Sequence, residues 1–145
     1  MAQARAAAGF TLIEVMIALA IVAITTTIAV STYRSHLRRG NRAQAVQSLL
    51  MAATEQEKFH LAHGIYGSRL DAGVGDDPPG LPVASRTPGG HYTLAVEVAT
   101  AAEFRVVATA TGSQADPACL RLSIDESGRR LAANSQGADS ASRCW

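Results

Sequence analysis

The sequence carries almost no net charge, because 12 Asp and Glu residues balance its 13 Lys and Arg residues. A net charge of +1 gives no global electrostatic attraction to nucleic acid. Cysteine is sparse, and Cys119 and Cys144 form no CxxC motif that would suggest a metal site. His60 and His63 lie one helical turn apart, but no third ligand is nearby. Since no Ser/His/Asp set or glycine-rich phosphate loop can be assembled either, we expect no enzymatic activity, no metal and no cofactor.

Glycine and proline are also missing from residues 10–30, which contain one formal charge, Glu14. As a helix with a rise of about 1.5 Å per residue, this run would be about 30 Å long, the thickness of the hydrocarbon core of a bilayer. In a secretory leader the small residues follow the apolar stretch, whereas here the small residues 6–9 precede it. Cleavage at that point would keep the apolar helix, so residues 10–30 are predicted to span a membrane in the mature protein.

The junction Gly9-Phe10-Thr11-Leu12-Ile13-Glu14 resembles the class III leader of type IV pilins and pseudopilins. The resemblance implies that a prepilin peptidase cleaves between Gly9 and Phe10 and that the new amine of Phe10 is methylated. It also implies that Glu14 pairs with this amine on a neighbouring subunit during assembly. A carboxylate inside lipid costs a few kcal/mol, and an ammonium partner lowers that cost. The alternative is a plain signal anchor whose Glu14 reaches the membrane interface.

Four arginines follow the apolar run closely: Arg34, Arg38, Arg39 and Arg42. Positive residues beside a membrane segment favour the cytoplasmic side, so charge alone would place the C-terminal part inside the cell. The leader motif and the cysteines indicate the opposite orientation, with a cytoplasmic N-terminus and a periplasmic C-terminal domain. On that interpretation the arginines could contact lipid headgroups while the subunit waits in the membrane.

The helix is predicted to continue through residues 31–63, which lack proline and are rich in helix-forming residues. Together with the apolar run, this predicts one helix of about 50 residues, or about 80 Å. Tyr33 and Leu37 lie on the side opposite the predicted core face, so either the helix bends at Gly40 or they face a neighbouring subunit. We expect the second. The predicted core face has amphipathic spacing and consists of Val46, Leu49, Leu50 and Ala53.

Residues 63–90 are rich in glycine and proline and are predicted to form a long surface loop, with Tyr66 and Leu70 holding it to the core. Strands are predicted beyond it, connected by a hairpin at residues 100–103 and a turn at 125–128. The alternating apolar residues are Tyr92, Leu94, Val96 and Val98, then Phe104, Val106, Ala108 and Ala110, then Leu120, Leu122 and Ile124, with a short return over residues 129–132. Antiparallel strands with one apolar face need a cover, which the helix supplies.

The C-terminal end carries a CxLxLxxxGxR-like pattern that closes with a second cysteine and a tryptophan, and it resembles PilE-type minor pilins of type IVa pili. The pattern consists of Cys119, Leu120, Leu122, Gly128, Arg129, Cys144 and Trp145. In an exported protein we expect Cys119 and Cys144 to form one disulfide around a loop of about 25 residues. The alternative is two free thiols in a cytosolic protein.

The resemblance implies an α+β type IV pilin fold, with a long N-terminal helix on a small antiparallel sheet and a C-terminal disulfide loop. It divides the chain into a leader (1–9), a transmembrane and filament-core half of the helix (10–30), an amphipathic half (31–63) and a globular part (64–145). The implied function is a minor subunit of a type IV pilus for adhesion and twitching motility, stored in the inner membrane and then extracellular. Implied partners are other pilins, prepilin peptidase, an inner-membrane assembly platform and membrane lipid.

Two other functions stay open: a type II secretion pseudopilin and a DNA-binding competence minor pilin. The second depends on a possible basic patch consisting of Arg121, Arg129, Arg130 and Arg143. Binding through such a patch would fall steeply with salt and would be lost when Arg129, Arg130 and Arg143 become alanine. The alternative for these arginines is a solvated surface where they alternate with acidic residues.

Overall fold

The computed structural model describes residues 9–73, 75–76, 80–112 and 116–145, so the predicted leader residues 1–8 lie outside the described residues. Two compact units divide the chain, Met1–His36 and Leu37–Trp145, and each is considered by itself. The elements are α1 (Leu12–His63), β1 (Tyr92–Ala99), β2 (Phe104–Ala110), β3 (Arg121–Asp125), β4 (Arg130–Ala133) and α2 (Ala141–Cys144). The long helix is therefore confirmed, although it begins at Leu12 rather than at Phe10.

In the first unit, α1 begins with a Thr-x-x-Glu sequence, a pattern typical of helix N-termini. The hydroxyl of Thr11 accepts a hydrogen bond from the backbone N–H of Glu14 at 3.3 Å, which satisfies one of the free donors of the first turn. This helix is long and apolar enough to cross a membrane, with a mean hydropathy of 2.4 in its most apolar window. Thr25 and Thr26 donate their hydroxyls to carbonyls one turn earlier, so the helix itself satisfies these polar groups.

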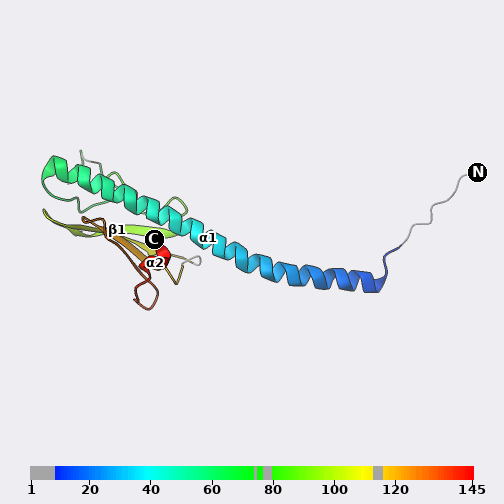
Figure 1. The fold of residues 1–145 in the computed structure, drawn as a ribbon. Helices are drawn as coiled ribbons and strands as arrows, with labels where there is room; N and C mark the ends of the chain where they lie inside the picture. Colours follow the sequence, from blue (N-terminus) through cyan, green and yellow to red (C-terminus); the bar gives the residue numbers. More distant parts are fainter. Residues whose placement is uncertain (1–8, 74, 77–79, 113–115) are drawn as a thin grey trace, which may run out of the picture. The chain divides into compact units, whose positions relative to one another are not determined.

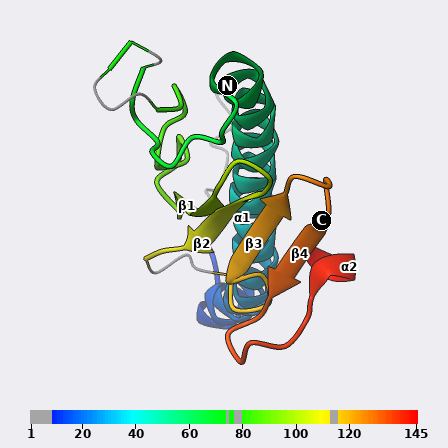
Figure 2. The same ribbon diagram turned by 90° about the vertical axis from the view of Figure 1, so that its left-hand side faces the viewer.

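In the second unit, the four strands form one antiparallel sheet in the order β1-β2-β3-β4. Figure 1 and Figure 2 show the C-terminal half of α1 lying along one face of this sheet, with α2 beside β4. The predicted α+β fold is therefore confirmed. The four-residue helix α2 was not predicted, because the tail that contains it is short and polar.

The register of β1 differs from the predicted alternation at its end. Tyr92, Leu94 and Val96 lie opposite Ala110, Ala108 and Val106 on the helix-facing side, as predicted. A bulge then occurs between Val96 and Val98, so Val98 lies opposite Arg105 and Ala99 lies opposite Phe104. Because one extra residue reverses the alternation, Ala99 joins the core and Val98 lies on the outer face. The prediction for Val98 was wrong.

The buried face of α1 is shifted relative to the predicted one. Leu49 is fully buried, but Leu50 remains 40% exposed, so the prediction for Leu50 was wrong. The helix runs unbroken through Gly40, and Leu37 is exposed rather than packed in the core. Small residues allow the helix to lie close to the sheet, and the buried positions are Ala45, Leu49, Ala52, Gln56 and Phe59.

Gln56 is a buried polar residue with both ends of its amide paired. Its Nε2 donates to the Gly67 carbonyl at 2.7 Å, and its Oε1 accepts from the Gly67 N–H at 2.8 Å. A Cβ at Gly67 would lie 3.1 Å from the Leu81 side chain, so the chain approaches the core closely at this point. The pair holds the first turn of the loop against α1.

Replacing Gln56 with alanine is expected to lower the free energy of unfolding by about 2–4 kcal/mol, because a buried N–H and a buried carbonyl of Gly67 lose their partner. Urea unfolding of the full chain in detergent micelles measures the loss. Gln47→Ala is the matched control, since Gln47 lies on the same helix and is exposed. Equal stability of the two variants would contradict a structural role for this amide.

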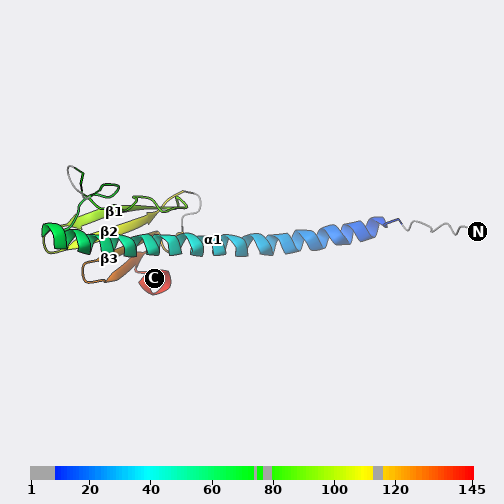
Figure 3. The same ribbon diagram turned by 90° about the horizontal axis from the view of Figure 1, so that it is seen from above.

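The loop between α1 and β1 is held to the core as predicted. Tyr66 is 8% exposed and stacks on His60 at 4.4 Å, while Leu70 packs against the core cluster. Figure 3 shows the loop beside the sheet at the β1 side. Its last part covers the free edge of β1: the N–H of Leu94 donates to Ser85 at 2.7 Å, and the N–H of Thr87 donates to Tyr92 at 3.0 Å.

The other edge of the sheet is covered by the C-terminal tail. The carbonyl of Ala132 accepts from the N–H of Ser140 at 3.0 Å, and the carbonyl of Leu131 accepts from the indole N–H of Trp145 at 2.9 Å. Asp139 also forms a bridge with Ala133. Covered edges of this kind prevent a strand of another chain from joining the sheet.

Candidate functional site

A disulfide closes the C-terminal end of the chain. Cys119 and Cys144 are bonded with a Cα–Cα distance of 5.7 Å and a sequence separation of 25 residues, which confirms the predicted pairing. Both cysteines are buried, and α2 brings Cys144 to its partner. The closed loop carries all four arginines of the predicted basic patch.

An ion pair connects α1 to the segment just before this loop. Arg42 Nη1 lies 3.2 Å from Asp116 Oδ2 and 3.1 Å from Cys119 Sγ, and the hydroxyl of Tyr92 donates to the Cys119 carbonyl at 3.0 Å. Burial, followed by the charge of Asp116, raises the pKa of Tyr92 to about 12, so its hydroxyl stays protonated and remains a donor. Arg42 therefore stabilises the region around the disulfide through Asp116 and Cys119. These contacts do not support the predicted role of Arg42 in binding lipid headgroups.

Two arginines of the predicted patch are held by carboxylates. Arg121 forms an ion pair with Glu97, and Arg129 Nε donates to Asp125 Oδ2 at 2.9 Å. Burial raises the pKa of the Asp125 carboxyl, but hydrogen bonds from Ser127 and Arg129 outweigh it, so that pKa lies below its ordinary value. The stabilisation is thus present above the unfolded pKa of Asp125 and is lost as the pH falls through its folded pKa.

The other two arginines lie elsewhere. Arg130 stacks over the ring of Trp145 with its guanidinium carbon 5.4 Å from the ring centroid, and Arg143 is exposed on α2. By the strand register, Arg121 lies opposite Ala133 and Arg130 lies opposite Ile124, so their side chains leave opposite faces of the sheet. The four arginines do not form one continuous surface.

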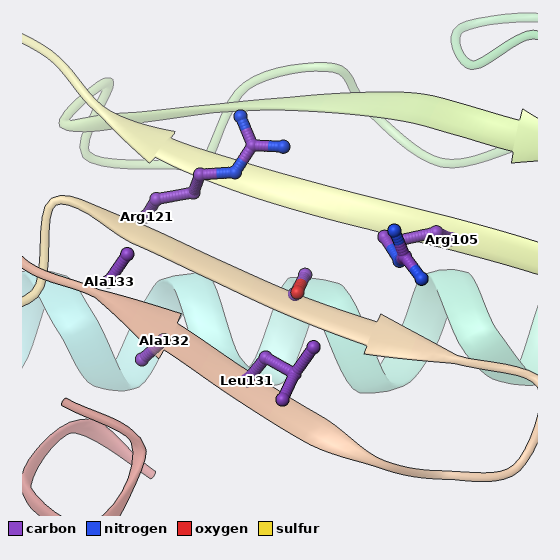
Figure 4. A pocket seen from close by; sticks show the side chains of 6 residues that line it. Arg105, Arg121, Leu131, Ala132 and Ala133 are labelled. Carbon is purple, nitrogen blue, oxygen red and sulfur yellow. The ribbon is translucent and has the colours of Figure 1, made fainter. Parts of the chain in front are cut away.

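A hollow on the outer face of the sheet was not predicted. It has a volume of about 220 Å³ and is lined by Arg105, Arg121, Ser123, Leu131, Ala132 and Ala133. Figure 4 shows Arg105 and Arg121 projecting from the face that is turned away from α1, one toward each end of the hollow. The alternation of β2 and β3 could have indicated this surface, because Arg105 and Arg121 both fall on the side opposite the apolar residues.

The two histidines near the end of α1 have structural partners. His60 Nε2 lies 3.0 Å from the Ala101 carbonyl, and His63 stacks on Phe59 at 4.1 Å between ring centroids. Asp76 accepts a hydrogen bond from the backbone N–H of Gly73 at 2.6 Å and so caps a turn of the loop. Within the part of the chain that the structure describes, no three His, Cys, Asp or Glu residues come together as metal ligands.

In the first unit, the residues predicted to serve processing and assembly are accessible. Gly9 is exposed and Phe10 is 82% exposed, directly before the start of α1. Glu14 is exposed in the first turn, and no ion pair to it exists among residues 9–36. Large apolar side chains surround Glu14 on the helix, including Ile13 at 62% and Ile17 at 54% exposure. The unit therefore presents an apolar helix with one carboxylate near its N-terminus.

Comparisons with known proteins show the family to which this chain belongs. Residues 4–30 match the prokaryotic N-terminal methylation motif, and residues 31–123 match the family described as type IV minor pilin ComP, DNA uptake sequence receptor. The chain is therefore a type IV pilin, with the class III leader that its first residues predicted. Since the second match covers more than half of the chain, the chain belongs to this family of minor pilins.

Two individual proteins are also similar to this chain. It is 38% identical over 69 residues to the type IV major pilin protein PilE1 of Neisseria gonorrhoeae, covering 46% of this chain and 31% of that relative's length. A type IV pilin structure from Shewanella oneidensis matches with a TM-score of 0.47 and 24% identity, over 74% of this chain and 97% of that one. As a member of a pilin family, the chain is predicted to be processed by a prepilin peptidase and to assemble with other pilins.

Proposed function

We propose that the chain is a minor subunit stored in the inner membrane and assembled into a type IV pilus through its N-terminal helix. The exposed apolar helix with the single carboxylate of Glu14 is the observation that supports this function. The proposed division is a leader of residues 1–9, a membrane and filament-core segment of 10–30, an amphipathic half of 31–63 and a globular part of 64–145. The N-terminus would lie in the cytoplasm and the globular part in the periplasm before assembly.

The mature N-terminus tests this proposal. We expect intact-mass and peptide analysis of protein from a cell with a prepilin peptidase to give a chain that begins at Phe10 with a methylated amine. Without the peptidase, the leader should remain attached. Gly9→Val should block cleavage, whereas Ala8→Val, one residue earlier, should not. A mature chain that begins after residue 30 would mean that the helix is discarded as an ordinary leader and would contradict the proposal.

A second proposed function is binding of DNA by the globular part. The family match over residues 31–123 supports it, because that family is described as a DNA uptake sequence receptor. Roles in adhesion and twitching motility, and contacts with the assembly platform, stay predictions from the pilin resemblance. The matching family is one of pilus subunits, so the pseudopilin alternative receives no support from it.

Duplex binding by the full chain in neutral detergent micelles tests the DNA function. Affinity should fall with salt, with a slope in log K against log salt of about −0.9 for each phosphate contacted. The variant with Arg129, Arg130 and Arg143 replaced by alanine tests the patch predicted from the sequence. Because Arg129 is paired with Asp125 and Arg130 stacks over Trp145, binding at the parental level by this variant would assign the phosphate contacts to other residues. Affinity of the parent that does not change with salt would contradict a receptor that recognises the phosphate backbone.

A further inference from the structure

The hollow on the outer face of the sheet, called the trough below, carries two guanidinium groups, those of Arg105 and Arg121. Arg105 lies opposite Asp125, and Arg121 lies opposite Thr109, so the two arginines are four residues apart along the strands. At about 3.3 Å per residue their backbones are about 13 Å apart. Ser123 and Leu131, which lie opposite each other on β3 and β4, line the surface between them, and Ala133 lies beside Arg121. Figure 4 shows the two guanidinium groups separated rather than converging on one point.

Arg105 has no anionic partner among the described residues. Asp125 stands opposite it, but the Asp125 carboxylate accepts from Ser127 at 2.6 Å, and from the Arg129 backbone at 3.0 Å and Nε at 2.9 Å. Arg105 Nε is buried and without a hydrogen-bond partner in the described chain. A buried donor without an acceptor is costly, so an incoming acceptor at this position is favoured.

Arg121, at the other end, is paired with an exchangeable partner. The bulge of β1 leaves Glu97 without a partner on β2, and its carboxylate reaches Arg121. The side chains of Arg121 and Glu97 are 47% and 36% exposed. Exposed ion pairs contribute little to stability, so a phosphate can replace Glu97 at small cost.

We propose that this trough binds one strand of duplex DNA, with Arg105 and Arg121 each contacting a phosphate and with Glu97 as the counter-ion that the DNA displaces. The proposal depends on the DNA-binding function proposed above and specifies its location. Two separated guanidinium groups favour a ligand with regularly spaced anions over a single free phosphate. Ser123 lines the hollow and offers a hydroxyl donor to the sugar-phosphate backbone between the two arginines.

Binding of a fluorescent 20-base-pair duplex, followed by anisotropy on the full mature chain in neutral detergent micelles, tests the location. Arg105→Ala and Arg121→Ala are each expected to weaken binding about fivefold and to make the salt slope shallower by about 0.9. Glu97→Gln removes the competing carboxylate and is expected to tighten binding about fivefold. Arg86→Ala, on the loop beside β1, is the matched control and should bind like the parent.

The outcomes separate the location from the function. If the parent binds DNA and the double variant R105A/R121A binds as tightly, the location is overturned while the DNA function stands. If the parent does not bind DNA at any salt concentration, the function fails and the location fails with it. Weaker binding by Glu97→Gln overturns the role of Glu97 as a displaced counter-ion. Poly-L-glutamate that displaces the duplex as effectively as unlabelled DNA would indicate an acidic protein partner instead and overturn the proposal.

Discussion

Replacing Glu14 with alanine is expected to reduce incorporation of this subunit into pili by at least about tenfold. A carboxylate in an apolar environment costs a few kcal/mol unless it is paired, and each 1.4 kcal/mol changes an equilibrium about tenfold. Among residues 9–36 no ion pair to Glu14 exists, and we expect its partner to be the Phe10 amine of a neighbouring subunit. Quantifying the subunit by immunoblot in sheared pili and in membranes measures incorporation.

Glu14→Gln separates assembly from helix initiation. Glutamine retains the Thr-x-x-Glu/Gln start of α1, where the Glu14 N–H donates to the Thr11 hydroxyl, but it removes the charge. Both variants should stay in the membrane and fail to assemble if the charge is what matters. Assembly of the glutamine variant at the parental level would limit the role of Glu14 to the start of the helix. Glu126→Ala, on an exposed turn, is the control for loss of one carboxylate.

Replacing Cys119 and Cys144 with serine is expected to lower the free energy of unfolding by about 3–4 kcal/mol. A cross-link with a separation of 25 residues restricts the unfolded chain by about that amount in the chain-entropy model. The loss should also release α2 and Trp145 from the edge of β4, because Cys144 and Trp145 are neighbours. Urea unfolding in detergent micelles, followed by tryptophan fluorescence, reports both effects, since Trp145 is the one tryptophan.

A reductant provides the matched control for the disulfide. Dithiothreitol should destabilise the parent to the level of the double serine variant and should leave that variant unchanged. Equal stability of parent and variant under oxidising conditions would contradict the prediction. A parent that resists reduction while native and loses the disulfide only in urea would still agree with it, because both cysteines are buried.

The sequence predicted those features that depend on long or repeated patterns. The apolar run with Glu14 predicted the helix, and the alternation in β2 and β3 predicted the sheet with its helix-facing side. The disulfide followed from two cysteines in a chain that was predicted to be exported. The apolar run and the strand alternation are strong signals because each extends over many residues. The disulfide is a strong prediction because two cysteines can pair in only one way.

Features set by tertiary contacts were missed. The bulge after Val96 turns Val98 from the helix-facing side of the sheet to its outer face. Nothing in the alternating sequence marks the extra residue. Leu50 was expected in the core, but Ala52 and Gln56 lie there because close packing favours a small side chain and the Gly67 backbone offers two hydrogen bonds. The predicted basic patch included Arg129, although Asp125, four residues earlier, neutralises it in an ion pair. The prediction omitted Arg105, which lines the hollow on the outer face.

The two covered edges of the sheet matter most where many copies are crowded together. Residues 85–87 occupy backbone groups of β1, and the tail up to Trp145 occupies those of β4, so neither border offers a row of open donors and acceptors to another copy. Unprotected borders would let crowded globular parts fuse strand to strand into disordered aggregates. In the proposed assembly, growth of an ordered fibre would then depend on the N-terminal helices alone, and the outer face of each sheet would stay available for the proposed ligand.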